Sequence, residues 1–303
     1  HTFQVGLDYN TNKTGTTSAT AGAVDQINVY EDISNILPAT TKLGEVTATY
    51  AESKGLGLLA QGVTTWNKYL KSFVGVRYSN IETSEDGTLG VKTADAWNPL
   101  VGIMISPTEN INIFGSYTNS SNPRSATRKD ANGNELGNEQ WDQIEAGVKT
   151  SWLKDRLRFN VTLFKINNKD MNLPVYDENW VATGYYQKGG NDQRQGVEVE
   201  FSGRILKNFE IITGYSFIEA QYKEHTSFVY NSSPLNTPKH TANAWANYTF
   251  ENNALEGLSI GAGIYHIGKR PMNDWSAGPV THEGIVPGQK PFDMRSYTLT
   301  NVQ

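Results

Sequence analysis

Few residues of this sequence stand in patterns that could do chemistry. Residues 130–135 weakly resemble a calcium-binding loop, but Gly133 comes too early and no glutamate stands at the closing position. We therefore predict a turn at Asp130 and no metal site. The five histidines are far apart and none has the i, i+4 spacing of a metal-binding helix: His1, His225, His240, His266 and His282.

Paired acidic residues do not give a catalytic site either. Glu198 and Glu200 are two residues apart, but in a strand this spacing places both on one solvated face. Gly189 and Gly190 lack the strand-to-helix context of a phosphate-binding loop and indicate a bend. We expect the protein not to be an enzyme.

Aromatic residues and arginines in the expected loops are stronger candidates. Aromatic rings offer rigid apolar contact, and arginine offers forked donors that suit an anionic ligand. The same residues could instead pack the loops against one another, and the sequence leaves both alternatives open. The candidate ligand-binding residues are Trp180, Tyr185, Tyr186, Arg194, Phe228, Tyr230, Arg270 and Trp275, with Arg124 in an earlier loop.

The elements that would position these residues are β-strands. Residues 193–222 are the clearest case, because Val197, Val199 and Phe201 alternate with polar residues and the alternation resumes after a short turn at 206–208. This pattern predicts a β-hairpin. Similar alternation begins at Phe3 and recurs to the last residues. The whole chain is therefore predicted to be all-β, with about twelve antiparallel strands.

The connections between the expected strands alternate in length. Every second connection is a short turn, and the others are long loops at 10–55, 83–95, 119–138, 167–192, 223–236 and 267–295. All long loops therefore leave one end of the sheet. Soluble β-sandwiches distribute long and short connections over both ends, whereas outer-membrane barrels have short periplasmic turns and long extracellular loops. The pattern predicts a transmembrane β-barrel.

Composition is consistent with this class. The 303 residues are 37% apolar and 19% charged, include no cysteine, and contain no run of about 18 apolar residues. These features argue against wholesale disorder, disulfides and a transmembrane helix. The net charge of −5 argues against nucleic acid as a partner.

The two faces of each strand differ as lipid and a wet lumen require. Residues predicted to face lipid are Val197, Val199, Phe201, Ile211, Tyr215, Ala244, Ala246, Ile260 and Ile264. Residues predicted to face the lumen are Glu198, Glu200, Glu210, Asn243 and Asn247. An aromatic belt beside the short turns is predicted from Trp66, Trp97, Trp152, Tyr248 and Phe250, with ordinary edge packing as the alternative.

Several segments together resemble one family. Residues 140–149, 157–170, 194–222 and above all 236–243 (NTPKHTAN) are similar, in the right order, to the barrel of TonB-dependent outer-membrane receptors, most closely the ferric-siderophore group. The resemblance implies a barrel of 22 strands that encloses a plug domain. On this basis residues 1–303 are expected to be a barrel fragment, without the plug and the C-terminal strands.

The resemblance also implies a function. The expected activity is import of a ferric siderophore across the bacterial outer membrane, energised by the TonB complex of the inner membrane through the plug. The expected partners are the siderophore, that complex and the lipid bilayer. No cofactor is expected, because the chelator carries the iron. The alternatives are import of cobalamin, haem or an oligosaccharide by the same architecture, or a soluble β-rich carbohydrate-binding protein.

Overall fold

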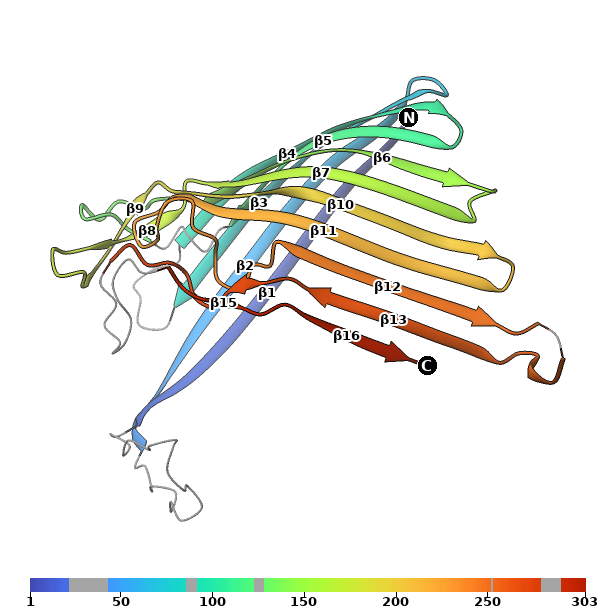
Figure 1. The fold of residues 1–303 in the computed structure, drawn as a ribbon. Coiled ribbons are helices and arrows are strands. Elements are labelled where there is room, and N and C mark those ends of the chain that lie inside the picture. Colours follow the sequence, from blue (N-terminus) through green and yellow to red (C-terminus); the bar gives the residue numbers. More distant parts are fainter. Residues whose placement is uncertain (22–42, 86–91, 123–127, 252, 279–289) are drawn as a thin grey trace, which may run out of the picture.

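The computed structural model describes residues 1–21, 43–85, 92–122, 128–251, 253–278 and 290–303. These residues form one curved antiparallel sheet and two small two-stranded sheets (Figure 1). The strands of the sheet are β1 (Thr2–Ala21), β2 (Leu43–Thr65), β3 (Leu70–Glu85), β4 (Lys92–Thr108), β5 (Ile111–Asn122), β6 (Glu139–Trp152), β7 (Leu157–Lys169), β10 (Asn191–Leu206), β11 (Phe209–Glu224), β12 (His240–Thr249), β13 (Ser259–Ile267) and β16 (Tyr297–Val302).

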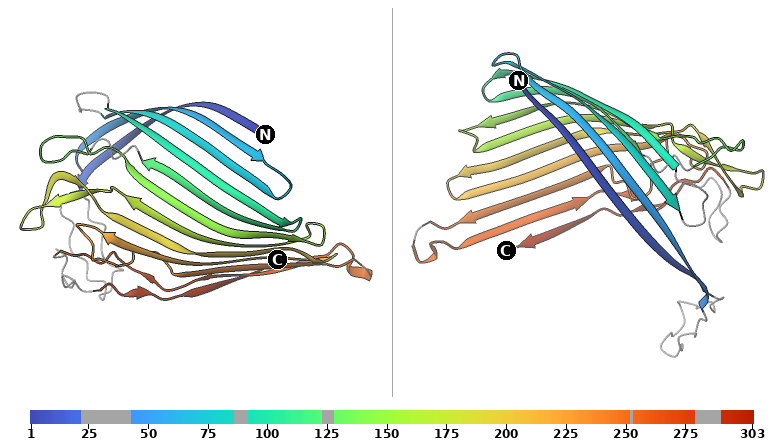
Figure 2. Two further views of the ribbon diagram at one scale, coloured as in Figure 1. Left: turned by 90° about the horizontal axis from the view of Figure 1, so that it is seen from above. Right: turned by 180° about the vertical axis from the view of Figure 1, so that it is seen from behind.

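Each strand of the sheet pairs with the next along it, in the order β1-β2-β3-β4-β5-β6-β7-β10-β11-β12-β13-β16. Figure 2 shows the sheet curved like a trough, with short turns at one end and the long connections at the other. The predicted single sheet of about twelve antiparallel strands is therefore confirmed. The described part of the chain contains no helical segment with the length and hydrophobicity of a membrane span.

Strand register confirms how the sequence divides the two faces. Val199 pairs with Tyr215 and with Val161, and the same face continues through Ala244 and Ile264. All nine residues predicted to face lipid share this apolar face, and all five predicted lumen residues lie on the opposite, polar face. The alternation of period two thus persists across neighbouring strands without a slip of one residue.

Large side chains of the apolar face are widely exposed. Leu163 is 57% exposed, Ile103 50% and Ile264 49%. A soluble protein rarely leaves so large an apolar surface in water, whereas a barrel wall presents it to lipid. We therefore assign the apolar face to the outside of the barrel and the polar face to the lumen.

The apolar run of each strand gives way to a polar residue towards the long loops. On this boundary the hydroxyl of Tyr78 donates to Asp95 Oδ1 at 2.9 Å, and the hydroxyl of Tyr117 donates to Asp142 Oδ1 at 2.7 Å. The ring of Tyr215 lies on the same face, and its hydroxyl is 2.8 Å from His240 Nδ1. Tyrosines with an apolar ring and a bound hydroxyl are typical of a membrane–water interface.

The polar face has its own cross-strand interactions. Arg77 of β3 contacts Asp8 of β1 across β2, with Nη1–Oδ2 and Nη2–Oδ1 distances of 2.8 and 2.9 Å. The β2 residue between them is Gly57, where a Cβ would lie only 2.7 Å from Asp8 Oδ1. Glycine therefore leaves the space in which this bidentate ion pair forms.

The predicted loop at 10–55 is wrong over much of its length. β1 continues to Ala21 and β2 begins at Leu43, and these extensions pair from Asn10 with Gly55 to Ala19 with Val46. Threonine is common here, and its branched Cβ favours extended backbone. The β1 extension is polar on both faces, so apolar alternation does not reveal it. The β2 extension carries only a short apolar alternation at Val46, Ala48 and Tyr50.

Three further expectations need correction. Trp97 does not lie beside a short turn; it pairs with Tyr78 towards the long loops, and their ring centroids are 4.9 Å apart. The loop at 167–192 contains a hairpin of β8 (Asn172–Tyr176) and β9 (Ala182–Lys188). The loop at 267–295 contains the short strands β14 (Arg270–Pro271) and β15 (Asp293–Met294). Trp66 and Trp152 do lie at strand ends beside short turns, as predicted.

Candidate ligand-binding site

Burial is concentrated in one region of the structure. Apart from glycines, the buried residues among those described are Asn168, Asn172, Leu173, Asp192, Ala220, Tyr222, Ser232 and Pro234. All of them lie at the long-loop ends of β7, β10 and β11 or in the loops that follow. We call the segments 170–190, 225–239 and 268–278 the loop cluster. The loop cluster and the strand ends directly beneath it contain the packed interior of the described residues.

The β8–β9 hairpin brings Trp180 into the loop cluster. The Asp177 carboxylate accepts hydrogen bonds from the backbone N–H groups of Asn179 and Val181 at 2.9 and 2.8 Å, which closes the turn. Trp180 adopts a φ of +60°, a left-handed conformation that is rare for a bulky residue. Its ring lies 5.5 Å from the ring of Tyr176. The turn thus holds a large aromatic side chain in a strained backbone position, as binding sites often do.

Backbone and side-chain hydrogen bonds join the three segments. The hydroxyl of Thr226 donates to the Pro174 carbonyl at 3.0 Å, and the Val229 N–H donates to the Trp275 carbonyl at 2.9 Å. The Trp180 indole covers Gly278, where any Cβ would collide with the ring. Each segment therefore contacts the next, and the cluster forms one packed unit.

Charged groups lie directly below the cluster on the polar face. The register pairs Asp192 with Asn168 on one side and with Tyr222 on the other. Arg194 Nη2 lies 3.0 Å from Asp192 Oδ2, and 49% of the Arg194 side chain remains exposed. The other oxygen of Asp192, Oδ1, is buried and accepts no hydrogen bond from the described residues. This arrangement fixes an arginine at the lumen surface and leaves part of its guanidinium accessible.

Tyr222 connects this row to the last segment of the cluster. Its hydroxyl donates to Asp274 Oδ1 at 3.0 Å, and the same oxygen accepts the Leu235 N–H at 2.7 Å. Burial, followed by the nearby Asp274 carboxylate, raises the pKa of Tyr222 above its ordinary value. Tyr222 therefore stays protonated and remains a donor across the physiological pH range.

His225 is held neutral within the cluster. Its ring lies 4.4 Å from the ring of Phe228 and 5.0 Å from that of Tyr222. Burial lowers the pKa of His225, against the opposing effect of the Asp274 and Asp192 carboxylates. The Ser227 N–H donates to His225 Nδ1 at 3.0 Å, which requires that nitrogen to be unprotonated.

The structure brings some of the predicted site residues together. Trp180, Phe228 and Trp275 belong to three different segments of the cluster, and an isolated β-bridge joins Phe228 to Ser276, the residue after Trp275. Arg194 lies beneath them on β10. Of the three aromatic residues, Phe228 lies closest to this row of charged groups, since its ring is 4.6 Å from that of Tyr222, the strand partner of Asp192.

Other predicted site residues have different surroundings. Tyr186 packs against Arg128, whose guanidinium carbon is 4.8 Å from the ring centre, whereas Tyr185 is 47% exposed. Tyr230 is 67% exposed, with the Lys223 ammonium 5.8 Å from its ring centre. Arg124 lies outside the described residues.

Arg270 also makes separate contacts. Its Nε donates to Asn236 Oδ1 at 2.6 Å, and its guanidinium carbon lies 5.4 Å from the ring centre of Tyr297. These contacts fix the loop after β13 against the loop before β12. The predicted alternative of loop packing therefore accounts for Arg270 and Tyr186.

Sequence reasoning missed Asp192, Tyr222, His225 and Asp274. The available signal was position, because Asp192 and Tyr222 end their strands on the polar face next to the loops. The contact between Tyr222 and Asp274 joins residues 52 positions apart, and no local pattern reveals it.

The candidates for metal and acid–base chemistry have ordinary structural roles. Asp130 Oδ1 accepts the N–H groups of Asn132 and Asn134 at 2.9 and 2.8 Å, which confirms the predicted turn. Glu200 is exposed and accepts from Asn160 Nδ2 at 3.2 Å. Among the described residues no group of three His, Asp or Glu side chains could hold a metal ion.

The fold and the site define a class: the wall of an outer-membrane-type β-barrel with a packed cluster of loop segments at one end. The chain belongs to the family of TonB dependent receptor-like β-barrels, whose sequence model matches residues 1–303. This family is located in the bacterial outer membrane. The resemblance found in the sequence is thereby confirmed over the whole chain.

Individual relatives include receptors for metal chelates. The chain is 27% identical to the metal-pseudopaline receptor CntO of Pseudomonas aeruginosa over 213 residues, which cover 70% of this chain and 29% of that receptor. It is 26% identical to the ferrichrome outer membrane transporter/phage receptor of Escherichia coli K12 over 270 residues, covering 86% of this chain and 35% of that protein. The chain thus spans about a third of the length of these relatives.

Solved structures show the same fold at lower identity. The closed form of the ferric-catecholate import receptor Fiu of E. coli K12 superposes with a TM-score of 0.75 at 19% identity, covering 99% of this chain and 45% of that receptor. The ferripyoverdine receptor of P. aeruginosa bound to ferripyoverdine gives a TM-score of 0.76 at 16% identity, covering 99% and 42%.

Proposed function

We propose that the protein to which this chain belongs binds a ferric siderophore at the bacterial outer membrane and imports it with energy from the TonB complex. The observation that carries the proposal is the packed loop cluster at the long-loop end of the sheet, where Trp180 lies against Gly278, Phe228 lies against Tyr222, and Asp192 holds Arg194 at the lumen face. Family membership and the named substrates of several relatives support the same class of ligand.

The chemistry of the site suits an anionic chelate. Aromatic rings cover the apolar surface of the chelator, and the exposed part of the Arg194 guanidinium pairs with its negative oxygens. Asp192 keeps the guanidinium oriented, and Tyr222 ties β11 to the loop that carries Trp275. The iron is cargo held by the chelator, so the protein needs no cofactor and no metal ligands of its own.

Release and transport belong to parts of the receptor beyond this wall. In the proposal a plug domain fills the barrel, and the inner-membrane TonB complex acts on that plug to release the ligand. The wall and its loops bind the chelate on the extracellular side and perform no chemical reaction. The protein is thus a transport receptor of the outer membrane.

A quenching titration of the purified full-length receptor tests the proposal. Ferrichrome, ferrioxamine B and ferric pyoverdine are the first probes, because relatives of the chain are named for these chelates. We expect at least one to quench tryptophan fluorescence saturably, and each iron-free chelator to bind more weakly. If no chelate binds to folded receptor, the proposal is wrong.

The predicted site residues are tested in the same titration. The triple variant Tyr185→Ala, Tyr186→Ala, Arg194→Ala should weaken binding by several kcal/mol, at about 1 to 3 kcal/mol per buried aromatic or charged contact. Of the three single variants, Tyr186→Ala should change the affinity for the chelate least, because the Tyr186 ring already packs on Arg128. Unchanged affinity in the triple variant would remove this loop from the site and leave Phe228, Tyr230, Arg270 and Trp275 as candidates.

A second candidate ligand is a chelate of another transition metal. It is favoured by the 27% identity to a metal-pseudopaline receptor over 70% of the chain. The chelator again carries the charge that Arg194 would recognise, so the same residues serve both candidates. Titration with one chelator loaded with Fe³⁺, Ni²⁺ or Zn²⁺ separates them.

A further inference from the structure

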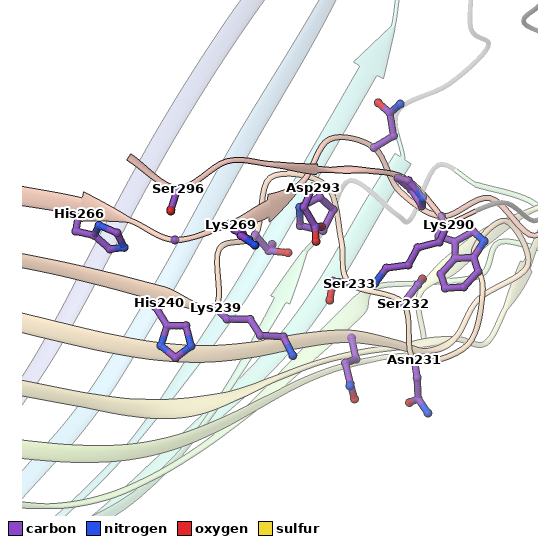
Figure 3. Close-up of a pocket in the computed structure, with 17 residues that line it drawn as sticks. Asn231, Ser232, Ser233, Lys239, His240, His266, Lys269, Lys290, Asp293 and Ser296 are labelled. Atoms are coloured by element: carbon purple, nitrogen blue, oxygen red, sulfur yellow. The ribbon is translucent and has the colours of Figure 1, made fainter. Parts of the chain in front are cut away.

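A pocket of about 590 Å³ lies between the loop-side ends of β12 and β13, the second and third segments of the loop cluster, and the chain around β15. Figure 3 shows its lining, with His240 and Lys239 from the start of β12, His266 and Lys269 from the end of β13, and Lys290 reaching in from the far side. The ligand-binding residues proposed above, apart from Trp275, do not line it.

Strand register places this pocket on the lipid-facing side of the sheet. His240 pairs with Phe217, and His266 pairs with Ala242, so both histidines belong to the apolar face. They follow directly after the last apolar residues of that face, Ala242 on β12 and Ile264 on β13. The pocket therefore lies just beyond the apolar band, at the level where an outer-leaflet headgroup begins.

The lining carries an excess of positive charge. Lys239, Lys269 and Lys290 face a single aspartate, Asp293. Lys239 lies 3.9 Å from the Glu219 carboxylate, and neither Lys269 nor Lys290 forms an ion pair with any residue that the structure describes. Hydroxyl and amide groups complete the polar lining, which includes Ser232, Ser233, Asn231 and Ser296.

We propose that this pocket binds the phosphate-bearing headgroup of an outer-leaflet lipid. Lysine ammonium groups bind phosphate as point charges, and juxtamembrane lysines attract anionic lipid. Trp275 and the two prolines Pro271 and Pro291 give the pocket an apolar border on which the sugar or acyl part of such a lipid can lie. The inference rests on the membrane location of the family and not on the siderophore proposal.

Native mass spectrometry of the full-length receptor in detergent tests this site. The probe is lipid A with two phosphates, added in increasing amounts to the wild type and to the variant Lys239→Ala, Lys269→Ala, Lys290→Ala. We expect the triple variant to bind this lipid at least roughly tenfold more weakly. A second variant with arginine at the three positions should keep the affinity, because the charge is retained.

The matched control removes the same charge at the opposite end of the barrel. Lys68, Lys154 and Lys207 lie at short turns, and their replacement by alanine should leave lipid A binding unchanged. Dephosphorylated lipid A should bind the wild type at least roughly tenfold more weakly than the phosphorylated form. Equal affinity for the two lipids, or equal losses in the two triple variants, would overturn the proposal.

The chelate titration distinguishes this site from the siderophore site. Saturable chelate binding by the triple lysine variant shows that its loops are folded. If the variant loses chelate affinity while lipid A binding is unchanged, the pocket belongs to the ligand vestibule and the lipid proposal is wrong. If no chelate binds the wild type, the siderophore proposal fails, and the lipid A comparison still tests the lipid proposal.

Discussion

In the wall of the sheet, Leu163 and Ile103 expose half or more of their side chains, whereas in the loop cluster Leu173 is 3% exposed and Ser232 5%. The wall has regular strand register and two chemically different faces. The loop cluster has left-handed residues at Asp170 and Trp180 and many side-chain hydrogen bonds to backbone groups. The wall is therefore a regular paired sheet with an exposed apolar face, whereas the loop cluster is an irregular structure with a small buried interior.

The difference shows where each region obtains its stability. The wall satisfies its backbone groups by pairing, and its apolar face gains stability only when lipid covers it. The loop cluster is in water and excludes it locally through a few buried side chains, as a small soluble domain does. A substitution in one region should therefore have little effect on the stability of the other.

The largest effect is expected in the wall, at mid-membrane. Val199→Arg places a charge in lipid and should lower the free energy of unfolding by about 2 to 4 kcal/mol, while Glu200→Gln, its neighbour on the lumen face, should change it little. Denaturant titration of the full receptor in lipid vesicles measures both. Equal costs at the two positions would contradict the assignment of faces.

Leu173→Ala should destabilise the loop cluster and leave the stability of the wall unchanged. Leu173 is buried and packs against Gly190, so closely that a Cβ on this glycine would lie 2.8 Å from Leu173 Cδ1. Truncation of Leu173 therefore leaves a cavity. We expect a loss of about 2 to 3 kcal/mol in the local opening of residues 172–190, measured by hydrogen exchange. Val181→Ala, at a side chain that is 60% exposed, is the control. Faster exchange throughout the strands of the wall would show that the regions are coupled.

A smaller effect is expected at the link between β11 and the last segment. Tyr222→Phe removes the hydrogen bond to Asp274 and keeps the ring, and it should destabilise the closed cluster by about 1 kcal/mol. Faster exchange of residues 231–236 and 270–278 is the readout. Asp274 keeps its bond from the Leu235 N–H, so the loop should still fold. No change in exchange would show that this bond does not hold the segment.

The weakest effect is pH dependence. Because burial lowers the pKa of His225 below its ordinary 6.5, an opened cluster takes up a proton more readily than the closed one. Above pH 6.5 His225 is neutral in both the open and the closed cluster, so it does not oppose closing. As the pH falls below 6.5, the open cluster is protonated first and the free energy of opening decreases. Exchange in residues 225–229 should therefore speed up in acid.

A matched variant isolates this titration. His225→Asn has no ionisable ring, and its side-chain oxygen can accept the Ser227 N–H as an Asx turn does. The variant should lose the acid sensitivity below pH 6.5 and keep the exchange rate found in the wild type above it. The same acid response in the variant would assign the effect to other groups.

Sequence periodicity predicted the wall well, since Val197 to Phe201 and their partners on β11 alternate, with Thr213 opposite Phe201 as the one polar interruption, and the register confirms each face. It missed the paired extensions beyond Asn10 and Gly55, because the β1 half is polar on both faces and the β2 half has only a short apolar alternation from Val46 to Tyr50. It also placed Trp97 at the wrong end, because the position of a ring along a long strand is fixed by the register of its neighbours.

The candidate site was only partly predictable. Residue type pointed to Trp180 and Phe228, which lie in the loop cluster, and to Arg194, which lies at the loop-side end of β10. The partners that position them come from distant segments, as with Trp180 and Gly278 or Tyr222 and Asp274. Such contacts depend on how three loops fold over one barrel end, and residue spacing within a single loop does not predict that arrangement.

The most direct test of the account is hydrogen exchange of the full-length receptor in lipid, with and without the ferric chelate that binds it in the quenching titration. If the loop cluster carries the site, the chelate should slow exchange by roughly tenfold or more in residues 172–190, 225–235 and 270–278, and should leave the short turns at 66–69 and 153–156 unchanged. Protection that misses all three segments while the chelate is bound would contradict the assignment of the site to the loop cluster.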